Sequence, residues 1–337
     1  MPIPAHKHSG LRSLATIVAI VLLLELALRP VMGNYAISKL RDLKPRDGRC
    51  LALSAGRRVV YTGWLLRIPP VVHAVNAAGY RGPVRPLARA PGALRILLVG
   101  DSFTFGQGVA ENDTIAARLE AGLGATAGRT VQVLNFGVEA LNIDEVLEQY
   151  ERFASRWDHD AVLYLLSPND LNHPVCPTTA WFSTLFRESY VARIGLIAAS
   201  LVLLGPGPER DTPAGRARLL TTLDRYAVVA REHDARFGVV MVSSPLEPAT
   251  WLDGFQLPLL DISALVRDKS NTIPYEGHLN PRGSGLVAQA IEGWLRRDPA
   301  WQTLFATRPD AARPPEAGAE SGDRPDPEHG DVLPTCS

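Results

Sequence analysis

Short apolar runs alternate with amphipathic stretches through the middle of this chain. The runs are rich in Leu, Ile and Val, have the length of buried strands, and lie at 94–99, 131–136, 161–166 and 237–242. Between them apolar residues recur every three or four positions, as at Ile115, Leu119 and Leu123, which predicts helices. Such alternation of strand and helix predicts a parallel sheet. The carboxyl-terminal ends of its strands should then lie along one edge.

The first apolar run of the chain is much longer than a strand. Residues 14–28 are almost continuously apolar, and the wider stretch 11–32 approaches the roughly 20 residues that a membrane-spanning helix needs. A cleaved signal peptide is the alternative, but no small-x-small cleavage site follows the apolar core. We therefore predict that residues 1–33 form an uncleaved signal anchor with one transmembrane helix.

The flanking charges leave the orientation of this helix open. Two basic residues precede the apolar run, and five follow it between positions 39 and 49. The positive-inside rule would then keep the following domain in the cytoplasm, but large domains are translocated regardless of charge. We expect a membrane-anchored protein whose main domain lies outside the cytoplasm. The acidic Glu25 within the run is expected to pair with Arg29, four residues later on the same helical face.

Two segments flank the predicted domain. Residues 34–93 contain many Pro, Gly and Arg residues and short strand-like runs at 59–62 and 71–75, so they are expected to pack as a lead-in on the edge of the domain. Residues 305–337 are rich in Pro, Ala, Gly and acidic residues, a composition typical of a disordered tail.

An insertion of about 175–235 is predicted within the domain. It contains a second apolar run, 194–204, which is shorter than a membrane span. The run has two interpretations: a lid or amphipathic element over the pocket, with membrane contact as one option, or a buried core helix. An amphipathic helix is expected after it, from Leu219 to Ala230.

Composition excludes several classes of function. The chain has 337 residues, with 35 Lys and Arg against 35 Asp and Glu, so its formal net charge is zero. A general nucleic-acid partner therefore has no electrostatic basis. The three cysteines, Cys50, Cys176 and Cys336, are far apart and form no metal-ligand or disulfide pattern.

Three successive strand ends carry residues suited to acyl transfer. Ser102 follows the first strand, Gly137 the second and Asn169 the third. A serine activated by a base is a nucleophile, and the backbone N–H groups of Ser102 and Gly137 with the Asn169 amide could stabilise the resulting oxyanion. The structural alternative for Ser102 is an ordinary helix N-cap.

A base is available near the end of the chain. His278 lies in a loop just before a stretch whose apolar face, which includes Val287 and Ile291, predicts a helix. A solvated loop histidine is the alternative if this residue is considered alone. Glu276, two residues earlier, could orient the imidazole and stabilise its charged form.

Taken together, these residues resemble the SGNH hydrolase superfamily of GDSL-type esterases, in particular its bacterial membrane-anchored members. The resemblance rests on four short blocks in a fixed order: Gly100-Asp101-Ser102, Asn135-Phe136-Gly137, Asn169-Asp170 and His278. It implies a flavodoxin-like three-layer α/β/α sandwich with a parallel sheet of about five strands, over residues 94–304. It also implies that Ser102 is the nucleophile, that His278 is the base, and that Ser102, Gly137 and Asn169 form the oxyanion hole.

The chain departs from the family pattern at two places. Ser167 stands where the third block usually has glycine, and Tyr275 stands where an aspartate usually lies three residues before the histidine. The nearest acid is Glu276, one residue later and one methylene longer. A Ser102–His278 dyad assisted by a backbone carbonyl is therefore an alternative to a triad that includes Glu276.

We expect a serine ester hydrolase that acts on an O-acyl ester through a seryl-acyl intermediate, without a metal or organic cofactor. The substrate is expected to carry an acetyl or short acyl group on a lipid or an envelope glycan. One alternative is an O-acyltransferase that modifies an envelope polysaccharide. Another is a non-catalytic, membrane-anchored binding module on the same scaffold.

Overall fold

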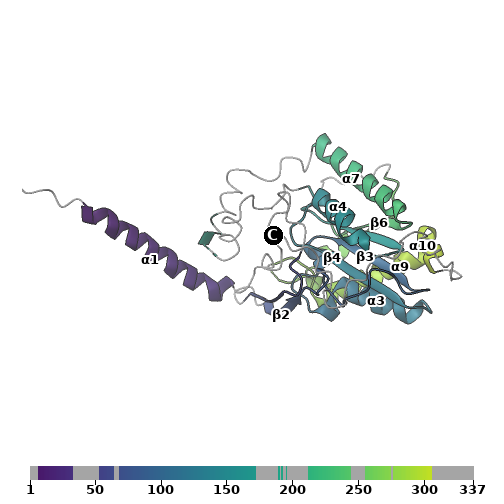
Figure 1. The fold of residues 1–337 in the computed structure, drawn as a ribbon, viewed down its shortest axis with the longest axis horizontal. Coiled ribbons are helices and arrows are strands. Elements are labelled where there is room, and N and C mark those ends of the chain that lie inside the picture. The colour runs from purple at the N-terminus through teal and green to yellow at the C-terminus, as the bar shows by residue number, and fades with distance from the viewer. Residues whose placement is uncertain are drawn as a thin grey trace, which may run out of the picture.

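The fold is built around a sheet of five strands that all run parallel (Figure 1). It was obtained as a computed structural model that describes residues 7–32, 53–63, 68–171, 189, 191–192, 195, 212–243, 255–274 and 276–305. In spatial order the strands are β4 (Val131–Gly137), β3 (Leu94–Gly100), β5 (Ala161–Leu166), β6 (Arg236–Met241) and β7 (Leu259–Asp261). The predicted five-stranded parallel sheet is thus confirmed.

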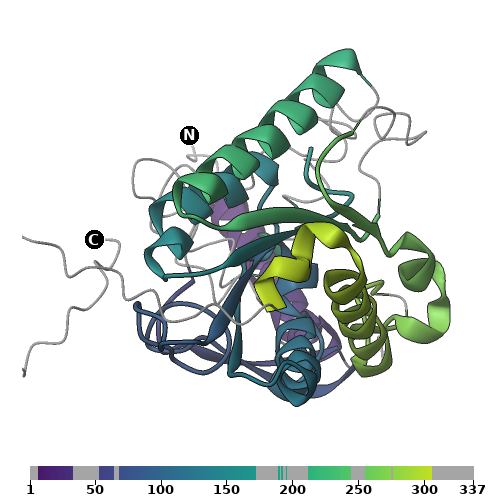
Figure 2. The ribbon, with the colours of Figure 1, turned by 90° about the vertical axis from the view of Figure 1, so that its right-hand side faces the viewer.

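Helices cover both faces of this sheet. On one side lie α4 (Ile143–Arg152) and α7 (Pro213–Glu232), and on the other α3 (Ile115–Thr126), α9 (Pro281–Arg297) and α10 (Pro299–Phe305) (Figure 2). The short helices are α2 (Ser102–Phe105), α8 (Ser263–Arg267) and the 3₁₀ turns η2 (Glu111–Asp113), η3 (Ala154–Arg156) and η5 (Lys269–Asn271). The result is the expected three-layer arrangement.

The sequence of β3 explains why helices must pack on both of its faces. Every residue of this strand is buried. Because successive side chains of a strand point to opposite faces, Leu97 and Val99 enter the core under α4 and α7, whereas Ile96 and Leu98 enter the core under α3 and α9.

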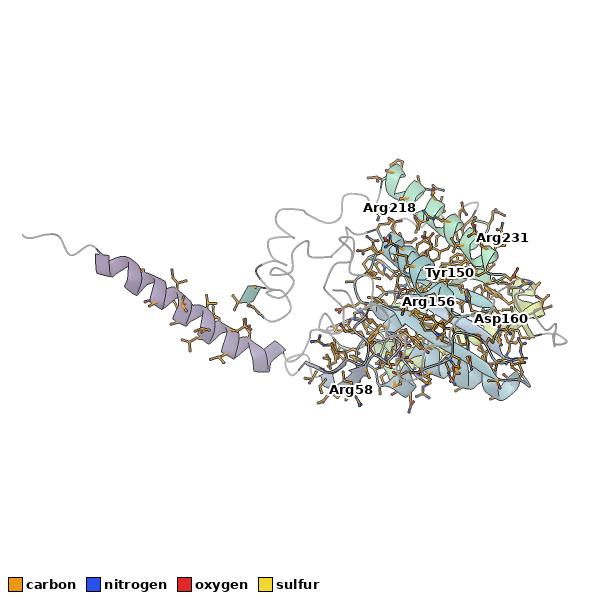
Figure 3. The ribbon with its side chains drawn as sticks, viewed as in Figure 1. Arg58, Tyr150, Arg156, Asp160, Arg218 and Arg231 are labelled. Atoms are coloured by element: carbon orange, nitrogen blue, oxygen red, sulfur yellow. The ribbon has the colours of Figure 1, made fainter. Side chains whose placement is uncertain are left out.

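Aromatic side chains fill the first of these cores. Tyr150 of α4, labelled in Figure 3, stacks on Tyr226 of α7 with 6.1 Å between ring centroids. Tyr226 in turn stacks on Phe237 of β6 at 5.3 Å. These contacts fix α4 and α7 against the sheet, and with them the loops at the carboxyl edge.

The three strands nearest the candidate site end at the same level. In the parallel register Gly100 is opposite Gly137 on one side and Leu165 on the other. The segments that follow β3, β4 and β5 therefore start side by side, which brings Ser102, Gly137 and Asn169 to one edge of the sheet as predicted.

The lead-in segment contributes an antiparallel hairpin. Its strands are β1 (Arg58–Gly63) and β2 (Ile68–Ala74), close to the two short strands expected from the sequence. Tyr61, His73 and Tyr80 are buried, and Tyr61 and Tyr80 join the same core as α4 and α7. The lead-in thus packs as an integral part of the domain.

The long apolar run near the N-terminus forms the helix α1 (Lys7–Met32), which projects away from the layered domain in Figure 1. Its apolar side chains are exposed, as for Leu23 at 66% and Leu26 at 65%. Among the residues that the structure describes, no helix combines the length and apolar character needed to cross a membrane. The predicted transmembrane helix is therefore not confirmed.

Glu25 accepts hydrogen bonds from the Ser189 hydroxyl and the Val191 N–H.

Some sequence predictions fall outside the described residues. These are the tail after Phe305 and almost all of the apolar run 194–204, so its two interpretations stay open. The amphipathic helix expected at the end of the insertion is present as α7.

Candidate active site

The nucleophile candidate stands at the first position of a very short helix. Asp101 caps α2 by accepting a hydrogen bond from the Phe103 N–H at 2.9 Å, so the N-cap is Asp101 and not Ser102. The glycine before it is required, because a Cβ on Gly100 would lie 2.3 Å from Thr104 Oγ1. Since the Ser102 side chain is not used as a cap, it is available for other chemistry.

A continuous chain of hydrogen bonds links Ser102 to His278 and Glu276. Ser102 Oγ lies 2.7 Å from His278 Nε2, and His278 Nδ1 lies 2.6 Å from Glu276 Oε1. A proton on Nδ1, donated to the carboxylate, leaves Nε2 to accept the proton of the serine hydroxyl. This is the order of groups that activates a serine in acyl transfer.

Backbone hydrogen bonds hold the histidine loop in place. His278 lies between Ile273, whose N–H donates to the His278 carbonyl at 2.7 Å, and the start of α9, which Asn280 caps through the Gly283 N–H. Phe103 packs against the imidazole with 4.8 Å between ring centroids. The His278 side chain is 18% exposed, which leaves its position accessible to a substrate.

The electrostatics of the pair favour an ionised Glu276. Burial by itself would raise the pKa of this fully buried side chain, but the hydrogen bonds and charge of His278 and the hydrogen bond from Tyr61 together lower it. Burial would likewise lower the pKa of His278, yet the hydrogen bond and charge of Glu276 outweigh it and raise that pKa. An ionised Glu276 beside the ring thus favours the protonated form of His278.

Two further carboxyl groups, Asp101 and Asp170, are buried near Ser102. Asp101 accepts a hydrogen bond from Ser167 Oγ at 2.9 Å, while Asp170 accepts from the Tyr164 hydroxyl at 2.6 Å and the Ser167 N–H at 2.5 Å. Burial raises the pKa of Asp101, and burial together with the charge of Asp101 raises that of Asp170 well above its ordinary value. Both groups therefore favour the protonated state more than free carboxyl groups do.

The three predicted oxyanion residues are found in different situations. Ser102 presents its N–H from the first turn of α2, where no intrahelical acceptor exists. Asn169 lies next to Ser167, whose hydroxyl is 2.6 Å from Asn169 Oδ1. The Gly137 N–H donates to Asn135 Oδ1 at 3.0 Å, so this donor already has an acceptor.

A packing requirement explains the glycine at position 137. A Cβ there would lie 2.1 Å from the Phe105 N and 2.7 Å from the Phe105 Cα. The glycine therefore lets α2, which carries Ser102, lie directly against β4. This packing role of Gly137 is not visible in the sequence alone.

Ala140 is a backbone feature that the sequence analysis missed. It has φ 59°, in the left-handed region that non-glycine residues rarely adopt. Its turn starts where the Val138 N–H bonds to the Gly100 carbonyl and ends where the Ile143 N–H bonds to the Asp170 carbonyl, so it runs along the carboxyl edge of the sheet. Strain of this kind is found at functional sites. An alanine gives no signal in the sequence for such a conformation.

Two other residues that the sequence analysis missed contact Glu276. The Tyr61 hydroxyl donates to Glu276 Oε1 at 3.0 Å, and Gln107 Nε2 donates to the same oxygen at 2.7 Å. They lie 215 and 169 residues away along the chain, and no local pattern connects them to the histidine loop.

Within the described part of the chain, no group of three or more His, Cys, Asp or Glu side chains could hold a metal ion.

The chain is similar to several solved structures at low sequence identity. No curated protein matches the chain. Similar solved structures include TesA, with 15% identity over 60% of this chain and 98% of that one and a TM-score of 0.42. They also include the esterase EstA from Pseudoalteromonas sp., with 12% identity over 60% and 96% and a TM-score of 0.41. A two-domain esterase active on acetylated mannans has 14% identity over 67% and 53%, also with a TM-score of 0.41.

The chain also matches the model of one protein family. The GDSL-like Lipase/Acylhydrolase family matches residues 98–286, more than half of the chain. The matched range includes Ser102, Gly137, Asn169, Glu276 and His278. The chain belongs to the GDSL-like lipase/acylhydrolase family and is a GDSL-type esterase or acylhydrolase.

Proposed function

We propose that this esterase hydrolyses its O-acyl ester through a covalent intermediate on Ser102, with His278 as base and Glu276 as the third member of a triad. The observation that carries the proposal is the unbroken path from Ser102 Oγ through the imidazole to Glu276, with separations of 2.7 and 2.6 Å. Both distances are within hydrogen-bond reach, which a base and its orienting acid require.

The proposed reaction has two halves. Ser102 Oγ attacks the ester carbonyl carbon while its proton passes to His278 Nε2, and the tetrahedral intermediate collapses as the alcohol leaves with that proton. Water then gives a proton to His278 and attacks the seryl ester. The acid is released, and the proton returns from His278 to Ser102 Oγ.

Backbone and amide donors would stabilise the negative charge that forms in each half. We assign this role to the Ser102 N–H and to Asn169, as the family resemblance implies. Gly137 stays a predicted third donor, and its N–H would have to leave Asn135 Oδ1 to serve. The Ala140 N–H, in the strained turn along the same edge, is a second candidate for this position.

The nucleophile is tested with p-nitrophenyl acetate. Ser102→Ala should abolish turnover, because the remaining groups cannot form the seryl ester. Ser155→Ala is the matched control: it also removes one serine hydroxyl, but that hydroxyl bonds only to the Glu151 carbonyl in the structure. Equal rates for Ser102→Ala and the wild type would overturn the assignment.

The proposal extends to the substrate, an acetyl or short acyl ester of a lipid or an envelope glycan. Rates on a series of p-nitrophenyl esters of increasing chain length would test the acyl part, and a steady rise with length would contradict it. The transferase alternative differs only in the hydroxyl that resolves the seryl ester. An added oligosaccharide that becomes acylated in proportion to its concentration would favour that alternative.

We also propose that the exposed apolar side chains of α1 keep the domain at a membrane. Ile17, Leu23 and Leu26 would otherwise lie in water, which is unfavourable for apolar surface of this extent. The full chain should then float with lipid vesicles in a density gradient. A chain in which these three positions are changed to Ser should not float, and equal flotation of the two would contradict the proposal.

A further inference from the structure

We propose that the N-terminal hairpin β1–β2 completes the active site: Tyr61, together with Gln107, positions Glu276 for its work on His278. This inference rests on the proposed triad. It adds two positioning residues, one of which lies in the lead-in segment. Tyr61 lies before residues 98–286, the range that matches the family.

The three side chains form a closed triangle of hydrogen bonds. Gln107 Nε2 donates to Glu276 Oε1 at 2.7 Å and to the Tyr61 hydroxyl at 3.2 Å, while that hydroxyl donates to Glu276 Oε1 at 3.0 Å. The same oxygen accepts a hydrogen bond from His278 Nδ1 at 2.6 Å. The carboxylate oxygen that orients the base is therefore the one that Tyr61 and Gln107 hold.

Glu276 needs such support because of its length and burial. Its side chain is fully buried, and a buried carboxylate is costly unless donors surround it. Apart from His278, which contacts it through both Nδ1 and the backbone N–H, the donors that the structure shows on Glu276 are Tyr61 and Gln107. Without them the side chain could rotate away from the imidazole.

The lead-in segment also holds the loop that carries Gln107. The Gly108 N–H donates to His73 Nε2 of β2 at 3.2 Å. The buried guanidinium of Arg81 donates to the carbonyls of Phe105, Gly106 and Val109 at 2.9, 2.7 and 2.7 Å. The loop is thus fixed from residues 73–81 on both sides of Gln107.

The loop that carries Gln107 also packs closely against the turn that carries Glu276. A Cβ on Gly108 would lie 2.2 Å from Ile273 Cδ1 and 3.5 Å from Tyr61 Cε1. Burial lowers the pKa of His73 to about 3, so this histidine stays neutral and its Nε2 remains an acceptor. The hairpin, the loop after α2 and the histidine turn therefore form one unit around Glu276.

Tyr61→Phe tests the proposal because it removes only the hydroxyl. Glu276 would then lose one of the donors that hold its carboxylate in place, so the carboxylate would turn away from the imidazole and its hydrogen bond to His278 would weaken. We expect kcat to fall roughly ten-fold with little change in KM, because misplaced catalytic groups slow the chemical step. The acidic limb of the pH profile of kcat/KM should move to lower pH, because a weaker Glu276 contact lowers the pKa of His278.

Two further variants complete the experiment. Gln107→Leu keeps the size of the side chain but removes both hydrogen bonds that Gln107 donates. It should lower kcat and move the acidic limb to lower pH, as Tyr61→Phe does. This variant therefore decides the question even if Tyr61→Phe does not fold. Tyr80→Phe is the matched control: Tyr80 is another buried tyrosine of the lead-in, but its hydroxyl bonds to Pro83 and Arg85. Its kinetic profile should follow the wild type.

The outcomes separate this inference from the proposed function. If Ser102→Ala is inactive but Tyr61→Phe and Gln107→Leu match Tyr80→Phe in kcat and in the acidic limb, the positioning role is wrong and the seryl mechanism stands. If Ser102→Ala keeps its activity, the proposed function itself fails. A lower kcat in both variants with an unmoved acidic limb would also overturn the inference, since a purely structural defect gives that result.

Discussion

Ser102 Oγ and His278 Nε2 lie 2.7 Å apart although 176 residues separate them along the chain. The serine is fixed by the end of β3 and the histidine by the start of α9. The helix α3 follows the serine loop and packs with α9 on the same face of the sheet. The segments that carry Ser102 and His278 are therefore held by the same hydrophobic core. Glu276 extends the contact into the interior.

Replacement of Glu276 by Gln should change the pH dependence of activity. The glutamate raises the pKa of His278, so its loss lowers that pKa and the acidic limb of kcat/KM moves to lower pH. We expect kcat to fall by roughly 10²- to 10⁴-fold, since the imidazolium loses its counter-charge. Glu292→Gln, the same change in an ion pair with Arg296 on α9, should leave the profile unchanged. If the acidic limb stays in place in Glu276→Gln, the dyad alternative is favoured.

Gly137→Ala should damage both stability and activity. The added methyl group would collide with the backbone of Phe105 and push α2 away from β4, at a cost of about 1–3 kcal/mol in the free energy of unfolding. Gly124→Ala in α3 is the control, because its Cβ meets nothing within 4 Å. An alanine there should stabilise the helix by roughly 0.5–1 kcal/mol. Urea unfolding and esterase rates measure both effects, and a fully stable, active Gly137→Ala would contradict the packing described for α2.

Ala140 should tolerate glycine but not a branched side chain. Its φ of 59° is easy for glycine and strained for valine, so Ala140→Val is expected to lose roughly 1–2 kcal/mol of stability. If its N–H also serves the oxyanion, kcat should fall in Ala140→Val by more than the loss of folded protein explains. Thermal unfolding and kcat of the two variants check this. A valine variant with wild-type kcat would remove Ala140 from the list of oxyanion donors.

The buried Asp170 should make stability depend on pH with a definite sign. Its folded-state pKa lies well above the ordinary value of 3.8, so the folded state binds its proton more tightly than the unfolded state. Its stabilising contribution is then fully present below pH 3.8 and is lost as the pH rises toward the folded-state pKa. Asp170→Asn cannot titrate, so the stability difference between wild type and variant should shrink as the pH rises from 4. Unfolding curves across the acidic and neutral range test this, and a difference that grows with pH would contradict it.

Much of the site could be predicted from the sequence because strand ends are local signals. The short apolar runs marked where β3, β4 and β5 end, and parallel register then placed Ser102, Gly137 and Asn169 on one edge. His278 and Glu276 could be assigned because they directly precede a helix with a clear apolar face. Glu276, which is offset by one residue from the family pattern, is within hydrogen-bond distance of the imidazole as the triad hypothesis requires.

Other features depended on contacts between segments that are distant in the sequence. Tyr61 lies in a hairpin that looked like an edge lead-in, and only the packing of β1 against the loop after α2 brings its hydroxyl to Glu276. Gly137 was interpreted through its N–H, whereas the close approach of α2 is visible only in three dimensions. Ala140 carries no residue-type signal for φ above zero. The membrane segment was predicted from the length of the apolar run and the missing cleavage site, and among the described residues no helix is long and apolar enough to span a membrane.

The contact between Tyr61 and Glu276 also bears on how members of this family could be recombined. A chimera that joined residues 94–305 of this chain to the lead-in of another member would keep the sheet, Ser102 and His278. It would lack the Tyr61 hydroxyl that bonds to the Glu276 carboxylate. The lead-in of the other member would have to supply a tyrosine at the matching position. The crossover point for such an exchange therefore lies before Arg58, well upstream of the first strand of the sheet.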